Sequence, residues 1–357
     1  MKNNLLIILS LLFGATGYAQ KPDFQVRLNS FFDNTEFGYS KYQMPQTMAG
    51  VHVAPTIGLG FDKQHRIEVG ADLLHEFGSD EMIGYSDVIA YYQFTNRPFR
   101  FVMGAFPREM AVEKYPRIFF QDSIANYRPT INGLVWSFTK QNSYANVWLD
   151  WTSRQTETRH EAFFMGWSGR LSAGCLYAQH FGYMFHFAGV KNPVVPEALH
   201  DNGLMLTSLG VDLAKKAGFE KLELNAGIVN GLERARAESK DWNRHNAFLS
   251  ELKVEYKGVG LFNTLYRGKG QMSFYNDHRS DLYWGDPIYR ASSYDRADIY
   301  INFLNTGVVK TRFTYSLHFT EGTMYHEQML NVSFNINKNR DKKEPKPRYL
   351  WSSLIRQ

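Results

Sequence analysis

The chain has 357 residues, of which 44% are hydrophobic, 15% aromatic and 21% charged, and its mean hydropathy is −0.39. It has no run of about 18 to 20 apolar residues, which excludes a helical membrane protein, and its aromatic content argues against disorder. The single cysteine excludes a disulfide framework, and the formal charge of +5 raises the question of a nucleic-acid partner.

Residues 1–19 have the pattern of a secretory signal peptide. Lys2 supplies a basic start, an apolar stretch covers residues 5–13, and the small residues Gly17 and Ala19 precede the expected cleavage point. The apolar stretch is too short to span a bilayer. We therefore predict a signal peptide over 1–19, with a membrane anchor or a buried helix as the alternatives.

After the signal segment, apolar and polar side chains alternate with the period of a β-strand. In residues 66–73, Ile67 and Val69 share one face while Glu68 and Asp72 lie on the other. The pattern predicts an all-β fold with sixteen such segments. They start near Phe24, Met48, Arg66, Tyr85, Phe99, Tyr127, Tyr144, His160, Cys175, Gly203, Lys221, Asn246, Val259, Asp295, Val308 and Thr323.

The connections between these segments alternate in length. Those after even-numbered segments are short, as at 62–65 and 257–258, whereas most of those after odd-numbered segments are long, as at 107–126 and 268–294. A transmembrane barrel has short periplasmic turns and long external loops. We therefore predict a transmembrane up-and-down antiparallel β-barrel of about 16 strands, with about 14 to 18 as the range, integral to the bacterial outer membrane with both termini periplasmic.

The polarity of the second face of each strand also favours a transmembrane barrel. Side chains opposite the apolar stripe include many charged residues, which suits a water-filled lumen better than the core of a soluble protein. The aromatic residues are numerous enough to form girdles at both membrane interfaces.

The signal peptide, the alternating connections and the last strand, Met329 to Lys338, together resemble the porin-like outer-membrane β-barrels of Gram-negative bacteria. The resemblance covers residues 20–338 and implies a channel for passive diffusion of small hydrophilic solutes or ions, with no enzymatic activity and no cofactor. It implies outer-membrane lipid, lipopolysaccharide and small solutes as partners, and it leaves a homo-oligomer open. Many such barrels end on an aromatic residue, whereas this chain continues beyond Ile336 to Gln357.

Charged residues on the inward face are the first candidates for function, because a pore selects ions by the sign and placement of its charges. Solvated or paired charges without a selective role are the alternative. The candidate basic pore-lining residues are Arg27, Arg100, Arg128, Lys310 and Arg312, and the acidic ones are Glu68, Asp72, Asp87, Asp150 and Asp298. Arg27, Lys310 and Arg312 are expected on one wall, because segments one, fifteen and sixteen meet when the barrel closes.

The long loop 107–126 is the second candidate. In porin-like barrels such a loop often folds inward as a constriction, and here it would set acidic groups against the basic wall; an exposed loop is the alternative. Its candidate residues are Glu109, Glu113, Arg117 and Asp122.

Two further functions remain open. A plugged barrel would act as a surface receptor or adhesion platform through its long loops, and an outer-membrane hydrolase would need a buried Ser/His or carboxylate pair in the lumen. No metal site is expected, since His180 and His186 share a strand face but lie about 20 Å apart.

The basic charge is concentrated at the end of the chain. Residues 338–357 hold seven basic and two acidic side chains, so residues 20–337, the predicted barrel, are nearly neutral. We interpret 338–357 as a basic periplasmic tail, and we expect no nucleic-acid partner.

Overall fold

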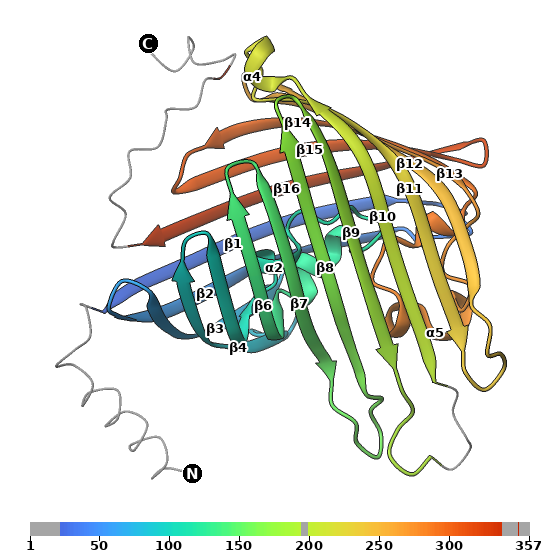
Figure 1. The fold of residues 1–357 in the computed structure, drawn as a ribbon, viewed down its shortest axis with the longest axis horizontal. Coiled ribbons are helices and arrows are strands. Elements are labelled where there is room, and N and C mark those ends of the chain that lie inside the picture. The colour runs from blue at the N-terminus through green and yellow to red at the C-terminus, as the bar shows by residue number, and fades with distance from the viewer. Residues whose placement is uncertain (1–21, 194–198, 338–348, 350–357) are drawn as a thin grey trace.

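Sixteen antiparallel strands form one closed barrel, in which each strand pairs with its sequence neighbours and β1 pairs with β16 (Figure 1). The structure is a computed structural model that describes residues 22–193, 199–337 and 349. The predicted all-β fold and strand number are confirmed, and the proposed signal peptide and tail lie outside the described residues, apart from Tyr349. The strands are β1 (Asp23–Glu36), β2 (Gln46–Phe61), β3 (His65–Glu76), β4 (Tyr85–Asn96), β5 (Phe99–Pro107), β6 (Thr130–Lys140), β7 (Ser143–Ser153), β8 (Ala162–Ala173), β9 (Leu176–Phe187), β10 (His200–Asp212), β11 (Lys221–Ala235), β12 (Asn243–Tyr256), β13 (Val259–Gly268), β14 (Ser293–Asn305), β15 (Val309–Thr320) and β16 (Thr323–Asn337).

The two ends of the barrel differ in their connections. At one end, which we call the turn end, β1 begins, β16 ends, and most links have two or three residues. The link 213–220 is longer because it contains helix α4 (Ala214–Ala217), which Gly218 terminates with φ +73°. At the opposite end, which we call the loop end, the links are long except for 321–322 between β15 and β16.

The outward face is an apolar band. Val69, Ile228 and Leu209 are 45%, 51% and 71% exposed, and each points away from the lumen on its strand. Closure leaves no unpaired strand edge, which is the condition for a sheet to lie in lipid. Among the described residues, no helix has the length and apolar character needed to cross a membrane.

Two loops from the loop end fold into the barrel. The link 108–129 contains α2 (Glu109–Val112) and α3 (Asp122–Tyr127), and the link 269–292 contains α5 (Tyr275–Leu282) and the 3-10 helix η2 (Pro287–Arg290). Figure 1 shows α2 inside the ring of strands. The loops bind each other, because the amide of Gln121 donates to the carbonyl of Trp284 (2.8 Å) and that of Asp286 to Arg117 (3.0 Å).

An aromatic core fixes these loops against the wall. Phe120 and Trp284 from the loops pack on Phe164 of β8, and Phe119 packs edge-on to Tyr183 of β9. All five side chains are less than 9% exposed. The lumen beside β7 to β9 is therefore filled with protein, and the larger remaining cavity is lined by β1 to β4 and β14 to β16.

Candidate functional site

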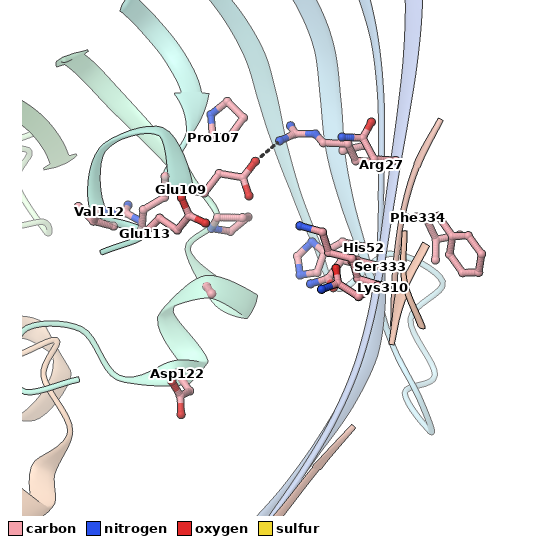
Figure 2. Close-up of a pocket in the computed structure, with 18 of the residues that line it drawn as sticks. Arg27, His52, Pro107, Glu109, Val112, Glu113, Asp122, Lys310, Ser333 and Phe334 are labelled. Carbon is pink, nitrogen blue, oxygen red and sulfur yellow. Dashed lines mark hydrogen bonds and ion pairs between the residues drawn. The ribbon is translucent and has the colours of Figure 1, made fainter. Parts of the chain in front are cut away.

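The basic wall and the inserted loop face each other across a cavity of about 1300 Å³. Arg27 on β1 forms an ion pair with Glu109 of α2 at 3.1 Å, and Glu113 and Lys310 line the same cavity. Figure 2 shows Glu109 and Glu113 on the loop opposite Arg27 and Lys310. The loop thus sets acidic groups against basic ones, as the sequence predicts for 107–126; their role in ion selection stays a prediction.

The other predicted basic residues lie in different settings. Arg312 faces the lumen and donates to Asn302 at 2.7 Å, and Arg100 donates to the carbonyl of Met110 at 2.8 Å. Arg128 does not lie on the sixth strand, because α3 occupies 122–127 and β6 begins only at Thr130. Its guanidinium stacks on the Trp284 ring instead.

All five predicted acidic residues face the lumen, and each has a polar partner. Asp150 and Asp298 pair with arginines of the loop 108–129, so these two contacts hold the wall and the loop together, because breaking a buried ion pair is costly. The pairs are Glu68 with Arg66, Asp72 with His52, Asp87 with the Tyr85 hydroxyl, Asp150 with Arg108, and Asp298 with Arg117 and Arg296.

A network of charges around Arg296 joins the barrel wall to α3 inside the lumen. Arg296 on β14 contacts Asp122 of α3 at 3.3 Å, Asp298 at 2.6 Å and Glu327 of β16 at 2.7 Å. A second cavity, of about 390 Å³, lies beyond it and is lined by Asp122 and Arg296. Gln121 and Asp122 line both cavities, so the start of α3 separates them.

Asp286 precedes η2 and lies beside the Arg296 network, since both residues line the smaller cavity. Its side chain accepts a hydrogen bond from the Ile288 amide at 3.1 Å and is buried. Burial raises the pKa of Asp286 to about 6, while the positive charge of Arg296 acts in the opposite direction. Burial therefore favours the neutral form of this carboxyl group, and the charge of Arg296 favours the ionised one.

A serine, a histidine and a glutamate meet where β11, β12 and the loop 269–292 come together at the loop end. The Ser273 hydroxyl lies 2.9 Å from Nε2 of His245, and Oε2 of Glu233 lies 3.2 Å from the same nitrogen. His245 and Glu233 are each 3% exposed, whereas Ser273 is exposed. We call these three residues the rim triad.

The hydrogen bonds around His245 fix its role. Its Nδ1 lies 2.7 Å from the carbonyl oxygen of Gly270, which only a protonated nitrogen can bond. In the neutral ring Nε2 is therefore an acceptor for the Ser273 hydroxyl, and once the ring is protonated Nε2–H can donate to the Glu233 carboxylate, 3.2 Å away. This is the arrangement of a nucleophile beside its general base.

Donors surround the serine and the glutamate. The Asn243 amide nitrogen lies 3.1 Å from the Ser273 hydroxyl, and Lys269 donates to the Asn243 oxygen at 3.1 Å. The Ser273 amide donates to Glu233 at 2.9 Å. Burial raises the pKa of Tyr283 above its ordinary value, and the negative charge of Glu233 adds to this, so the phenol keeps its proton.

Sequence reasoning missed the rim triad. Its members stand at 233, 245 and 273 on two strands and a loop, and no short motif joins residues with this spacing. The alternation of side chains along each strand offers one sign of the site, because it places both Glu233 and His245 at inward positions. Among the described ranges, no three His, Cys, Asp or Glu side chains are grouped as metal ligands.

Solved structures with the same architecture are outer-membrane porins. A loop-deletion mutant of OmpT from Vibrio cholerae has a TM-score of 0.52 at 8% identity, covering 89% of this chain and all of that one. An anion-selective porin from Comamonas acidovorans has 0.52 at 9% identity with the same coverage, and OccK9 (OpdG) from Pseudomonas aeruginosa has 0.51 at 10%, covering 89% and 98%. The predicted porin-like barrel fold is confirmed.

Sequence comparison identifies the family. No curated protein matches the chain. The model of the family described as "Lipid A 3'-O-deacylase-type" matches residues 15–344. That description names an enzymatic activity, so the prediction that the protein is not an enzyme is wrong; a porin-like barrel pattern reports the fold and carries no information on chemistry. With nearly all of its length matched, the chain belongs to the lipid A 3'-O-deacylase-type family.

Proposed function

We propose that the protein is an outer-membrane esterase that removes an ester-linked acyl chain from lipid A or a closely related glycolipid, with the rim triad as its catalytic centre. The observation that carries the proposal is the bond between the Ser273 hydroxyl and the accepting Nε2 of His245. An exposed nucleophile beside a buried, oriented base fits acyl transfer.

In the first step, the Ser273 oxygen attacks the ester carbonyl carbon while Nε2 of His245 takes the hydroxyl proton. Glu233, 3.2 Å from Nε2, stabilises the imidazolium that forms, and the Gly270 carbonyl keeps the ring in place through Nδ1. The Asn243 amide lies close enough to the nucleophile to donate to the carbonyl oxygen as it becomes negative.

In the second half of the reaction, the bond between the carbonyl carbon and the sugar oxygen breaks, and the sugar hydroxyl leaves with the proton from His245. Water then attacks the acyl-serine, again with His245 as the base, and releases the fatty acid. The chain supplies every proton acceptor and donor that these steps require.

The position of the rim triad supports this substrate. We propose that the loop end faces the cell exterior, as long loops do in outer-membrane barrels, with both termini periplasmic. The outward apolar band then lies in the bilayer, and the rim triad lies on the inner side of the wall at the loop end, where Ser273 is exposed beside the outer-leaflet rim. Lipid A is anchored by its acyl chains, so its ester bonds lie near this depth.

Replacing the nucleophile tests the proposal. Ser273→Ala should abolish release of fatty acid from lipid A by the purified protein in detergent, followed by mass spectrometry. Ser280→Ala is the matched control, because Ser280 is also exposed and lies on α5 in the same loop. Full activity in Ser273→Ala, with the barrel folded, would exclude the rim triad as the catalytic centre.

A second candidate is a narrow channel for small hydrophilic solutes or ions. It is supported by the two cavities, which approach each other at Gln121 and Asp122 along the side of the lumen that the aromatic core leaves open. In this reading the Arg296 network is the constriction and the basic wall sets ion selectivity.

Conductance across a planar bilayer tests the channel. We expect small single-channel currents in the wild type and a shift of the reversal potential toward cation selectivity in Lys310→Glu, because Lys310 is exposed in the larger cavity. Inserted protein that passes no current would rule out the channel and leave the esterase proposal untouched.

A further inference from the structure

Three arginines lie on the outward face beside the rim triad. Arg234 and Arg236 on and just beyond β11 and Arg244 on β12 alternate with inward residues, because neighbouring side chains of a strand point to opposite faces. Glu233 pairs with Asn243 across these strands, and Leu232 pairs with Arg244. Arg234 and Arg244 are thus direct chain neighbours of Glu233 and His245, on the other side of the wall, and Arg236 lies two residues beyond Arg234.

These three residues, which we call the arginine strip, carry excess positive charge. Asp201 on β10 accepts from both Arg234 and Arg236 at 2.6 to 2.7 Å, so one carboxylate faces two guanidinium groups. Within the described part of the chain, no ion pair joins Arg244 to an acidic side chain, and Arg244 is exposed. The strip therefore has room for a further anion.

The strip stands at the edge of the apolar band. Along β11 the outward positions run from Ile228, which is 51% exposed, through Leu232 to Arg234. Six residues of strand span about 20 Å. Trp242 stacks on Arg234 with its ring centre 4.3 Å away, and tryptophan with arginine is typical of a membrane interface.

We propose that the arginine strip binds a phosphate group of a phosphorylated glycolipid in the outer leaflet and so holds the substrate beside the rim triad. The inference rests on the proposed function for the orientation of the barrel. A lipid phosphate fits better than free phosphate, because the same surface continues directly into apolar side chains that accept acyl chains. Guanidinium groups bind phosphate through paired hydrogen bonds.

The test measures binding separately from hydrolysis. Ser273→Ala protein in detergent micelles is titrated with fluorescent lipid A carrying both phosphates and with the same lipid after removal of its phosphates. Arg244→Gln and Arg236→Gln are introduced singly, with Lys215→Gln in the exposed helix α4 at the turn end as the control. Arg234 is retained so that Asp201 keeps a partner.

We expect each arginine variant to weaken binding of phosphorylated lipid A about fivefold and to leave binding of the dephosphorylated lipid unchanged. Lys215→Gln should bind both lipids as the parent does. Equal affinity of the arginine variants and the parent for phosphorylated lipid A would overturn the inference. Complete competition by inorganic phosphate would also overturn it, because the strip would then be a site for the free ion.

Failure of this inference is distinguishable from failure of the proposed function. With Ser273 restored, the arginine variants should hydrolyse a neutral short-chain nitrophenyl ester at the wild-type rate, since that substrate has no phosphate. If Ser273→Ala hydrolyses this ester normally, the catalytic assignment falls while the binding result stands. If hydrolysis depends on Ser273 but the arginine variants bind lipid A as the parent does, only the inference of a phosphate site at the arginine strip is overturned.

Discussion

The contribution of Glu233 to catalysis follows from its distance to His245. In the transition state His245 carries a positive charge, and Oε2 of Glu233 lies 3.2 Å from Nε2. Two unit charges at that separation attract each other by about 5 kcal/mol at an effective dielectric constant of about 20. Because Glu233 is buried, little water screens this attraction.

Glu233→Gln removes the charge while keeping an oxygen that accepts from the Ser273 amide. The amide dipole retains part of the stabilisation, so we expect the hydrolysis rate to fall by roughly 10³-fold, below the 10⁴-fold that about 5 kcal/mol would give. Fatty-acid release from lipid A is the primary assay, and hydrolysis of a nitrophenyl ester in the same detergent gives the rate of chemistry on a substrate without phosphates.

Glu251→Gln is the matched control. Glu251 is an inward, buried glutamate on β12 that contacts Asn225 and Lys253 and not His245. Glu251→Gln should keep the wild-type rate, and both variants should show the same far-ultraviolet circular dichroism. A folded Glu233→Gln protein with wild-type activity would refute the assignment of Glu233 to the imidazolium.

Three further predictions concern the inserted loops and the wall. Asp150→Ala breaks a 2.7 Å ion pair with Arg108 in which both side chains are almost fully buried. Because Arg108 keeps its bonds to the carbonyls of Arg128 and Thr130, we expect the free energy that holds the loop in place to fall by about 3 kcal/mol, which protease cleavage within 108–129 would detect. Protease resistance equal to that of the wild type would contradict this prediction. Gly166→Ala places a methyl group 2.1 Å from the buried Trp148 ring, so the free energy of unfolding should fall by about 1 to 3 kcal/mol in urea titration, while Gly38→Ala, which meets no atom within 4 Å, should leave it unchanged. Burial raises the pKa of Asp286 to about 6, so its neutral form stabilises the folded loop below about pH 4, and this stabilisation is lost as the pH rises through 6. Asp286→Asn should abolish this pH dependence, measured by hydrogen exchange of residues 286–291. A wild-type pH profile as flat as that of the variant would count against the prediction.

The sequence determined the strands, their faces and the closed barrel because each of these depends on local patterns. Alternation with period two assigns every residue of a strand to one side, as Ile67 and Glu68 show, and the lengths of successive links distinguish the two ends. The error at Tyr127, where a strand was expected and α3 lies, arose because a short helix inside a loop leaves no comparable period.

The candidate site depended on tertiary structure. The inward fold of 107–126 was expected only through the resemblance to porin-like barrels, and no pattern in the sequence indicates that 269–292 enters the lumen. Loop sequences carry polar and apolar residues alike, so only packing against Phe164 and Tyr183 decides where Phe120 and Trp284 lie. The same insertion carries Ser273 to His245, 28 residues away in the chain.

Sequence alone thus established a barrel with an apolar exterior and a polar interior, while the tertiary structure decided which interior residues meet. The physical reason is the distance in sequence over which each interaction acts. Strand periodicity depends on neighbours in the chain, whereas the rim triad forms only because strand pairing holds Glu233 beside His245 and the inserted loop adds the serine. The arginine strip arises from the same pairing, read on the opposite face.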